Sequence, residues 1–376
     1  MNIATKYNVD LILKNTNALS GTPKILMRQA QALSIGKFNV SVISENFHPN
    51  LKNNENIECK KTIKWPQSNL NQRKFFNWQA IRKTRGDALV IGHGDSLNQD
   101  ILFLHTCVHM GKEIAPGPHN DKNLSIPFHQ MIFEQGSFKK IVCVSHMMKN
   151  DIKKRFNISC PMSVIYPGHD KDLINQVSIT EVKKIHEQLH LQENELVVGV
   201  IASGNLENRG AFALLRAMSF LEEAERKKIK LLIIGKESKP SKIYDLALLN
   251  QMKDRVLWMN PRNDVANLIS AVDIAVHAAH IEAAGISFLE ILAMSKPVIT
   301  TKTVGFSEIL SDIQKPFIIE KQDPELIAKC LSDLIKDKDL RVKMGEANRK
   351  VAAPLTWEKY DEEFMKLIQF HLSEMG

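Results

Sequence analysis

The sequence has 376 residues, which is too long for one ordinary hydrophobic core, so we expect two domains. With 44% hydrophobic and 24% charged residues, the composition is that of a folded globular protein. No apolar run approaches the roughly 18 residues of a transmembrane helix, and the N-terminus lacks a signal-peptide pattern. Five scattered cysteines without zinc-type spacing fit reduced thiols, so a cytoplasmic protein is expected.

Positive charge is concentrated in the first half of the chain. Residues 1–170 hold 22 Lys and Arg against 12 Asp and Glu, whereas residues 171–376 hold 28 against 30. A basic half suits an acidic partner, such as nucleic acid, an anionic lipid or a phosphorylated substrate. A basic face that only meets solvent is the simpler alternative, and the charge distribution alone leaves both open.

The sequence pattern of the first half predicts strands that alternate with helices. Residues 2–6 and 10–14 compete as the first strand. A polar loop then ends at Ser20 and Gly21, and a helix begins near Pro23, because proline suits a first turn. Open parallel sheets place ligands at the carboxyl ends of strands, so this loop is a candidate site for phosphates or an acceptor. Further strands are expected at residues 40–44, 88–92, 101–105, 140–144 and 163–166, helices at residues 73–85, 126–137 and 146–156, and mostly loop at residues 46–72.

Two histidines follow the strand expected at residues 101–105. His105 stands at the carboxyl end of this strand, where chemistry usually occurs in a parallel sheet, and His109 follows four positions later. A half-buried histidine with a purely structural role is an equally good interpretation. Farther on, Ser145 is expected to cap the helix at residues 146–156.

The second half opens with a buried strand at residues 195–202, the loop Ser203-Gly-Asn-Leu-Glu-Asn-Arg-Gly210 and a helix. Such a loop presents backbone N–H groups to an anion, and Arg209 is the natural phosphate partner. Residues 262–264 open a later helix, whose N-terminus Asp264 is expected to stabilise. Further strands are expected at residues 230–234, 255–259, 274–279, 297–301 and 316–320, and helices at residues 241–252, 306–312, 323–337 and 339–352. The alternation indicates that both halves are doubly wound α/β domains.

The most informative stretch surrounds Glu282 and Glu290, which lie eight positions apart. A buried strand precedes Glu282, and helical spacing of apolar residues begins close to Gly285. The unpaired N–H groups of such a helix start suit a phosphate, so the two carboxylates flank a candidate anion site. The alternative is that both acids only complement the helix dipole.

The C-terminal segment, residues 356–376, has an apolar face at helical spacing. We assign an N-terminal domain to residues 1–170 and a C-terminal domain to residues 171–355. The last helix is expected to return to the first domain, although packing on its own domain is the simpler arrangement.

The segment from Glu282 to Glu290 resembles the E-x7-E signature of the family 4 retaining glycosyltransferases, whose GT-B fold has two Rossmann-like domains facing a cleft. Arg209-Gly210 stands where the family has Lys-Gly. Residues 164–168 (VIYPG) resemble the family's hinge, and residues 298–309 follow its pattern after the second Glu. Within the family, residues 132–136, 262–265 and 282–286 are most similar to the lipopolysaccharide core glucosyltransferases.

This resemblance implies a hexosyltransferase that works with retention and without a metal. The implied donor is a UDP-sugar, expected to be UDP-glucose, and the implied acceptor is an inner-core sugar of lipopolysaccharide. Glu290 would accept hydrogen bonds from the ribose, Glu282 would face the donor sugar, and Arg209 would stabilise the leaving diphosphate. The implied catalytic residues are Glu282, Arg209 and His105, and the implied donor-binding residues are Ser20, Gly21, Asn205, Arg209, Arg262, Asn263, Ala284, Gly285, Ile286, Ser287 and Glu290.

The same resemblance implies that the basic first domain holds a lipid-linked phosphorylated oligosaccharide acceptor. The protein would then contact the cytoplasmic face of the inner membrane peripherally. No cofactor beyond the donor, no metal and no nucleic acid is expected. The oligomeric state stays open.

The sequence departs from the family in three places. Ser20-Gly21 replaces the usual Gly-Gly, and Asn208-Arg209 replaces an Arg-Lys pair, so one phosphate-facing cation is missing. The segment after His109 contains Pro-Gly-Pro where the resemblance implies a more basic, membrane-contacting helix. Another donor or acceptor within the family and a GT-B nucleotide-sugar 2-epimerase are therefore alternatives. A nucleic-acid-binding protein is disfavoured, because the basic helix at residues 146–156 carries a single aromatic residue, Phe156.

Overall fold

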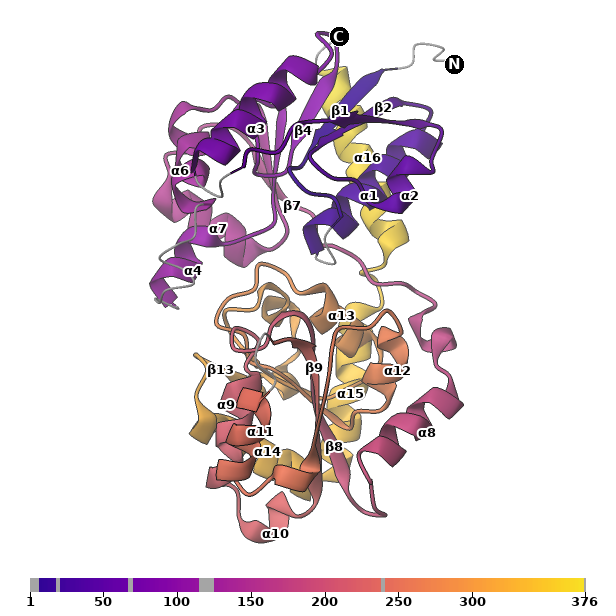
Figure 1. Ribbon diagram of the computed structural model, residues 1–376, viewed down its shortest axis with the longest axis vertical. Coiled ribbons are helices and arrows are strands. Elements are labelled where there is room, and N and C mark those ends of the chain that lie inside the picture. Colours follow the sequence, from indigo (N-terminus) through magenta and orange to yellow (C-terminus); the bar gives the residue numbers. More distant parts are fainter. Residues whose placement is uncertain (1–6, 18–20, 67–69, 115–124, 238–240, 375–376) are drawn as a thin grey trace. The chain divides into compact units, whose positions relative to one another are not determined.

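A computed structural model describes residues 7–17, 21–66, 70–114, 125–237 and 241–374. The chain divides into two compact units (Figure 1). Unit 1 comprises Met1–Pro167 and Glu358–Gly376, and unit 2 comprises Gly168–Trp357. The domain boundaries expected at residues 170 and 356 lie close to these.

Unit 1 is built on a parallel sheet, whose central strands are short, buried apolar runs. In the part of the chain that the structure describes, the strand order is β3-β2-β1-β4-β5-β6-β7, and all neighbouring strands are parallel. The strands are β1 (Asn8–Ile12), β2 (Asn39–Ser44), β3 (Ile57–Lys61), β4 (Leu89–Gly92), β5 (Ile101–Leu104), β6 (Lys140–Cys143) and β7 (Met162–Val164). The helices are α1 (Gly21–Ile35), α2 (Pro49–Lys52), α3 (Leu70–Lys83), α4 (Val108–Ile114), α6 (Ser125–Gln135), α7 (His146–Arg155) and α16 (Trp357–Ser373).

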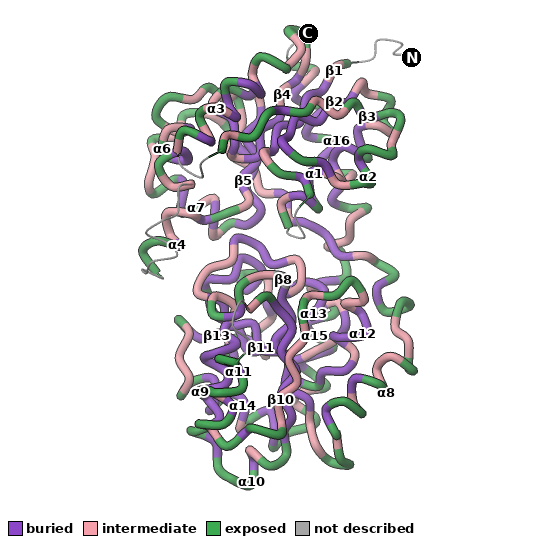
Figure 2. Tube along the Cα trace, viewed as in Figure 1, coloured by how far each residue is buried: buried purple, intermediate pink, exposed green. Residues whose placement is uncertain are grey.

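Buried residues follow the strands of the sheet, whereas exposed residues lie on the outer helices and loops (Figure 2). The α1 helix turns Leu26, Ala30 and Leu33 inward, as their spacing predicts. The predicted cap of α7 is also confirmed, since the Ser145 hydroxyl accepts a hydrogen bond from the Met148 amide at 3.2 Å.

The beginning of unit 1 differs in detail from the sequence prediction. Of the two competing first strands, residues 10–14 overlap β1, whereas residues 2–6 lie outside the described residues. The region expected to be mostly loop, residues 46–72, contains the short strand β3 and the helical turn α2, and α3 begins within it at Leu70. The α2 turn starts at Pro49, where the missing N–H costs nothing.

The α16 helix belongs to unit 1 and not to the domain that precedes it in the chain. The Phe364 ring is fully buried and packs edge-on against Phe103 of β5, with 6.0 Å between ring centroids. The side-chain amide of Gln29 donates a hydrogen bond of 2.8 Å to the Tyr360 hydroxyl. An ion pair of 2.7 Å joins Arg28 to Asp361.

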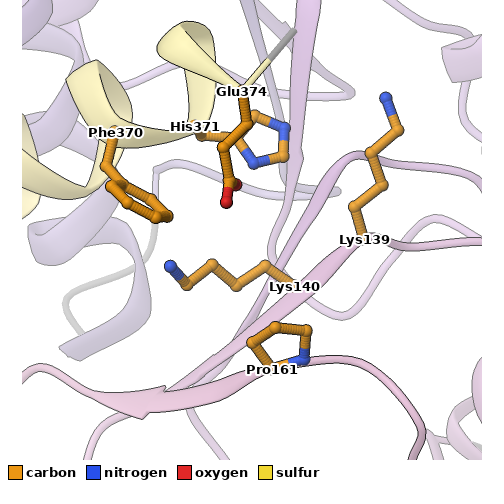
Figure 3. A pocket seen from close by; sticks show the side chains of 6 residues that line it. All are labelled: Lys139, Lys140, Pro161, Phe370, His371 and Glu374. Carbon is orange, nitrogen blue, oxygen red and sulfur yellow. The ribbon is translucent and has the colours of Figure 1, made fainter.

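A pocket of about 570 Å³ lies where the end of α16 meets the beginning of β6 (Figure 3). It is lined by Lys139, Lys140, Pro161, Phe370, His371 and Glu374. Because Lys140 is the first residue of β6, this pocket lies at the amino ends of the strands. It is therefore at the opposite edge of the sheet from His105, which follows the carboxyl end of β5.

Unit 2 contains a second parallel sheet, for which the described residues have the order β10-β9-β8-β11-β12-β13. The strands are β8 (Leu196–Asn205), β9 (Ile229–Lys236), β10 (Val256–Met259), β11 (Ile274–His277), β12 (Val298–Thr301) and β13 (Ile318–Ile319). The α-helices are α8 (Ile179–Gln188), α9 (Ala211–Ala217), α10 (Glu223–Arg226), α11 (Ser241–Leu249), α12 (Val265–Ser270), α13 (Ile286–Ala293), α14 (Pro324–Lys336) and α15 (Lys338–Ala352).

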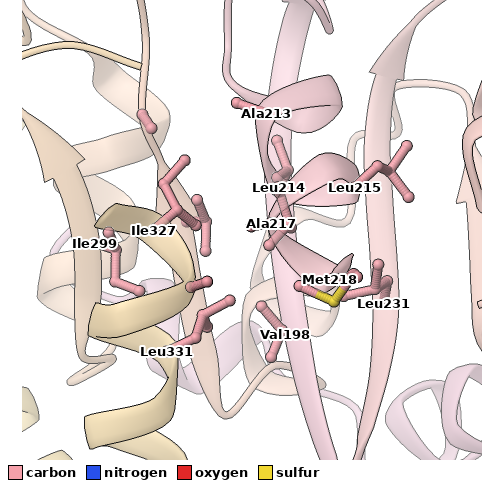
Figure 4. Close-up of a cluster of buried hydrophobic side chains, with 14 of the residues drawn as sticks. Val198, Ala213, Leu214, Leu215, Ala217, Met218, Leu231, Ile299, Ile327 and Leu331 are labelled. Carbon is pink, nitrogen blue, oxygen red and sulfur yellow. The ribbon is translucent and has the colours of Figure 1, made fainter. Parts of the chain in front are cut away.

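One face of this sheet is covered by α9 and α14, which pack together over it (Figure 4). Leu214 of α9 and Leu331 of α14 are fully buried beside Val198 and Leu231 of the sheet. Truncating one such leucine to alanine typically costs about 2–5 kcal/mol. This packing holds β8, and with it the loop that carries Arg209, in a defined position.

Two predicted elements of unit 2 are shorter or of another type. The helix expected at residues 306–312 is the 3₁₀ helix η4 (Gly305–Ile309). The strand expected at residues 316–320 is only the two-residue β13, because Pro316 lies within the 3₁₀ helix η5 (Asp312–Phe317) and cannot donate to a strand ladder.

Both sheets are doubly wound, as predicted. The strand order reverses between β1 and β4 in unit 1 and between β8 and β11 in unit 2. In such sheets, ligands bind beyond the carboxyl ends of the strands at the point of reversal. None of the described helices is both long enough and apolar enough to cross a bilayer.

Candidate active site

The candidate site in unit 2 is built from the two loops that follow β8 and β11 at the reversal point. Asn205 ends β8, and its side-chain oxygen accepts a hydrogen bond of 3.0 Å from the Asn208 amide, which closes the first loop. The Asn208 carbonyl accepts a bond of 2.9 Å from the His280 amide in the second loop. The two loops therefore form one connected structure.

The Glu282 carboxylate is the centre of this site. Its Oε2 atom lies 2.7 Å from a guanidinium nitrogen of Arg209 and 2.7 Å from Nε2 of His277. Burial by itself raises the pKa of Glu282, but the Arg209 charge and the hydrogen bond from His277 outweigh it and hold this pKa below its usual value. Glu282 is therefore ionised at neutral pH.

His277 is a site residue that the sequence prediction missed. It is the last residue of β11 and is fully buried, and its Nε2–H donates to Glu282. The buried strand expected at residues 274–279 contains this polar side chain, and the observed strand ends at it. His105 was a candidate because it stands at the carboxyl end of a parallel strand, and His277 stands at the same place in its own strand.

Arg209 reaches Glu282 because Gly210 allows a sharp turn into α9. Gly210 has a φ of 86°, and a Cβ atom there would lie only 2.6 Å from the carbonyl oxygen of Ala278. Any other residue would be strained and would push the two loops apart. The Arg209 guanidinium also lies 3.4 Å from the Ile281 carbonyl oxygen.

The backbone around Glu282 is held on its other side by the segment after β12. The Glu282 amide donates to the Thr303 carbonyl at 3.0 Å, and the Glu282 carbonyl accepts from the Gly305 amide at 2.8 Å. The Ala284 carbonyl accepts from the Phe306 amide at 3.2 Å. These hydrogen bonds fix the backbone that carries the Glu282 carboxylate.

Directly after this segment, Gly285 turns the chain into α13. Its φ of 101° is a left-handed conformation, and the helix starts at Ile286, as predicted. The first N–H groups of the helix, at Ile286 and Ser287, have no partner within the helix by its geometry. Glu290 is a little more than one turn into α13 and is only 6% exposed.

Asp264 stands at the N-cap of α12, at the helix start where it was predicted, but its side chain makes no capping hydrogen bond to the helix backbone. Instead, the Arg262 guanidinium binds it with two hydrogen bonds of 2.8 and 2.6 Å, and this contact lowers the pKa of Asp264. Arg262 and Asn263 follow β10, which β9 separates from β8, so the described contacts do not bring them to Glu282.

The remaining predicted residues belong to unit 1. Gly21 begins α1, whereas Ser20 lies outside the described residues. His105 follows β5, and its Nε2 lies 2.8 Å from Nδ1 of His93, which follows β4. Burial lowers the pKa of His105 to about 3, so this ring is neutral at neutral pH.

A charged cluster lies beside these histidines at the carboxyl edge of the unit 1 sheet. Asp95 accepts a bond of 2.9 Å from the Lys14 amide and forms an ion pair of 2.5 Å with Arg73. Burial and the Arg73 charge lower the pKa of Lys14, whose ammonium donates to Gln72 at 2.9 Å. Glu45 interacts electrostatically with the same cations, so Lys14, Arg73 and Lys64 face the two carboxylates Asp95 and Glu45 at this edge.

The amino-acid sequence and the fold were compared with those of known proteins. Residues 181–351 match the family model described as glycosyl transferases group 1. This stretch is a group 1 glycosyltransferase domain. The group 1 domain contains Arg209, His277, Glu282 and Glu290, and therefore the whole unit 2 site.

Curated relatives of the chain are glycosyltransferases. The lipopolysaccharide glucosyltransferase WaaG of Escherichia coli (strain K12) is 26% identical over 228 residues, which is 60% of this chain and 60% of that protein. The D-inositol 3-phosphate glycosyltransferase of Corynebacterium jeikeium (strain K411) is 26% identical over 220 residues, 56% of this chain and 52% of that protein. The chain thus spans less than two thirds of the length of these relatives.

Solved structures match nearly the whole chain. The crystal structure of WaaG has a TM-score of 0.79 at 20% identity and covers 95% of this chain and 99% of that one. Anabaena HepE in complex with UDP-glucose has a TM-score of 0.76 at 14% identity, with 96% and 99% covered. The chain therefore has the GT-B fold of two Rossmann-like domains.

Proposed function

We propose that the chain is a retaining glycosyltransferase that moves a hexose from a UDP-sugar, UDP-glucose, to an inner-core sugar of lipopolysaccharide. The observation that carries this proposal is the Glu282 carboxylate, held ionised by Arg209 and His277 next to the start of α13. The WaaG relative named a lipopolysaccharide glucosyltransferase and the HepE structure with bound UDP-glucose support the choice of acceptor and donor.

The chemical problem in such a transfer is the leaving diphosphate, whose negative charge grows as the bond to the sugar breaks. In the proposed mechanism, Arg209 and the N–H groups of Ile286 and Ser287 stabilise this charge. These groups are already oriented by the loop contacts, so little reorganisation is needed. No step of this proposal requires a metal ion.

The two carboxylates have separate tasks in this mechanism. Both Arg209 and His277 bind Oε2 of Glu282. No described residue forms a hydrogen bond or an ion pair with Oε1, so this oxygen is assigned to the hydroxyls of the donor sugar. Glu290, one turn into α13, is assigned to the ribose hydroxyls. Ionised carboxylates suit both tasks because they only accept hydrogen bonds.

Unit 1 is proposed to hold the acceptor. Its basic composition and the cluster of Lys14, Arg73 and Asp95 suit a phosphorylated, lipid-linked oligosaccharide. Such an acceptor is presented at the cytoplasmic face of the inner membrane, so the protein is assigned to the cytoplasm with peripheral membrane contact. His105 is proposed to line the sugar side.

Donor binding and turnover test this proposal directly. The purified chain is screened by calorimetry and by donor hydrolysis against UDP-, GDP- and ADP-sugars, and we expect UDP-glucose to be preferred. Glu290→Ala should weaken UDP binding, and Arg209→Ala should lower kcat by about 10²–10³. Normal transfer by both folded variants would contradict the site. An epimer of the UDP-sugar formed without acceptor would indicate the 2-epimerase instead.

A further inference from the structure

An aromatic cluster lies on the outer side of α3 in unit 1. Trp65 packs against Phe75 with 5.1 Å between ring centroids, and Phe75 stacks on Trp78 at 5.8 Å with an angle of 14°. Trp78 is 50% exposed, and Ile63, two residues before Trp65, is 73% exposed. Aromatic and aliphatic side chains gathered on a surface in this way indicate a contact with another surface.

The position of Ile63 is set by α3 itself. The Gln79 side chain binds the Ile63 backbone with two hydrogen bonds of 2.9 Å, one to the amide and one from the side-chain amide to the carbonyl oxygen. The exposed apolar side chain is thus held next to the aromatic cluster. We call Ile63, Trp65, Phe75 and Trp78 the Trp78 surface.

The segment of the chain that carries the Trp78 surface is rich in cations. Between Cys59 and Gly86 the sequence has eight Lys and Arg and no Asp or Glu. Within the described part of the chain, five of these eight form no ion pair: Lys61, Lys64, Lys74, Arg82 and Lys83. Lys74 and Arg82 lie one turn before and one turn after Trp78 on the exposed face of α3, and the Arg82 guanidinium lies over the Trp78 ring at 4.1 Å.

The Trp78 surface adjoins the carboxyl edge of the unit 1 sheet. Gln72 of α3 connects the two, because its side chain donates to the Trp65 carbonyl at 3.5 Å and accepts from the Lys14 ammonium at 2.9 Å. Lys14 belongs to the charged cluster assigned to the acceptor. A partner that covers the Trp78 surface would therefore lie next to the acceptor-binding edge.

We infer that the Trp78 surface binds the headgroup region of an anionic lipid bilayer. Tryptophan has an amphipathic ring that favours the membrane interface, and unpaired Lys and Arg are attracted to anionic lipids. The long side chains of Lys74 and Arg82 reach the phosphates while Trp78 and Ile63 enter the interface. Lipid binding itself does not depend on the proposed function. The role assigned to it does, because that role is to bring a lipid-linked acceptor next to Lys14 and Arg73.

The geometry favours a bilayer over a nucleic acid or a soluble glycan. A base or a sugar ring needs a free aromatic face for stacking. The face of Trp78 is in contact with Phe75 and with Arg82. Insertion into an interface uses the exposed edge of the ring and needs no free face.

Vesicle sedimentation tests the inference with the full chain. We expect binding to phosphatidylcholine vesicles that contain phosphatidylglycerol, and little binding to pure phosphatidylcholine. Each cation near an anionic surface contributes about fivefold, so Lys74→Gln with Arg82→Gln should weaken the partition coefficient about 25-fold. Trp78→Ser should weaken it about tenfold, since the indole loses its apolar burial.

Two matched variants serve as controls. Lys329→Gln with Lys338→Gln removes two exposed cations from unit 2 and should leave vesicle binding unchanged. Lys149→Gln with Lys153→Gln and Lys154→Gln removes the basic strip of α7 and should weaken binding less than the α3 variant. Circular dichroism confirms that each variant is folded.

The outcomes separate the possibilities. Wild-type binding by the folded α3 variants, or complete loss of binding in the α7 variant alone, would overturn the inference. So would a labelled RNA or soluble core oligosaccharide whose binding depends on Trp78 while vesicle binding does not. Tryptophan quenching by brominated lipid that falls in Trp78→Phe would support it.

Donor hydrolysis without vesicles distinguishes this inference from the proposed function. If the wild-type chain hydrolyses UDP-glucose but does not bind anionic vesicles, the lipid surface is wrong and the proposed function stands. If it binds the vesicles through Trp78 but uses no nucleotide sugar, the surface stands and the proposed function fails.

Discussion

Arg209 and His277 keep the Glu282 carboxylate ionised and hold it in place. A buried carboxylate without partners would tend to take up a proton, whereas two donors 2.7 Å away keep this one ionised. Both donors lower the pKa of Glu282, whereas burial raises it. His277 lies within an apolar strand sequence, so its role is recognised only from its hydrogen bond to Glu282.

At the residue scale, removing the hydrogen bond from His277 should shift the pH dependence of activity. In His277→Phe, the folded-state pKa of Glu282 should rise, because burial is then opposed by Arg209 alone. A hydrogen bond to a charged group contributes about 1.5–3 kcal/mol, so the acidic limb of the kcat/KM profile should move up by about one pH unit or more.

The matched variant for this experiment is His277→Gln, whose side-chain amide can still donate to Glu282. It should restore most of the wild-type profile. An unchanged acidic limb in a folded His277→Phe protein would show that Glu282 does not govern the reaction.

Among the elements, the loop between β8 and α9 depends on one glycine. Gly210→Ala places a methyl group 2.6 Å from the Ala278 carbonyl in a left-handed conformation. We expect a loss of about 1–3 kcal/mol in the free energy of unfolding and weaker UDP binding, since Arg209 moves with the loop. Urea unfolding and calorimetry measure the two effects.

Gly86→Ala is the control for this prediction, because a Cβ atom at Gly86 meets nothing within 4 Å. Its stability and donor binding should stay close to wild type. If Gly210→Ala binds UDP normally, the loop does not position Arg209 as described.

The α16 helix is the second element with a testable role. Phe364→Ala removes a fully buried ring that packs on β5, which typically costs about 3–5 kcal/mol. The loss should appear in hydrogen exchange of unit 1 and leave unit 2 largely protected. Phe370→Ala, at a position that is 54% exposed, should have a much smaller effect. Equal losses in both units would contradict the assignment of α16 to unit 1.

The elements also show what sequence patterns can and cannot predict. Most strands were predicted within one or two residues, because parallel strands buried on both faces are plain apolar runs. The α8 helix was not predicted, although Ile179, Val182 and Ile185 recur at helical spacing and Ser178 caps its first turn, so this helix was predictable from its pattern. The loops bearing Arg209 and Glu282 were predicted from their turns and charges, but the ion pair between them depends on loop contacts that no local pattern encodes.

For the whole molecule, buried histidines make the two units differ in their response to acid. Burial lowers the pKa values of His105 and His129 to about 3, and that of His93 is also far below its ordinary value. In the unfolded chain these rings take up protons below about pH 6.5. The unfolded state then binds more protons than the folded one, so stability is lost as the pH falls from about 6.5 toward 3.

We therefore expect unit 1 to lose protection against hydrogen exchange before unit 2 as the pH falls from 7.5 to 5. Each such histidine can contribute up to about 1.4 kcal/mol per pH unit in this range. His129→Phe should make the loss of unit 1 stability less steep. Parallel losses in both units would show that the histidines are not responsible.

The division of unit 1 between two distant parts of the chain has a consequence for biosynthesis. A ribosome that has made Pro167 must still make all of unit 2 before it reaches Glu358. At roughly 5–20 residues per second, the face of unit 1 that α16 covers waits on the order of ten seconds or more without its helix. Unit 2 can complete its core during that interval. The domain that is translated first is thus the one that finishes folding last, and a chaperone that shields its open face would be most useful during those seconds.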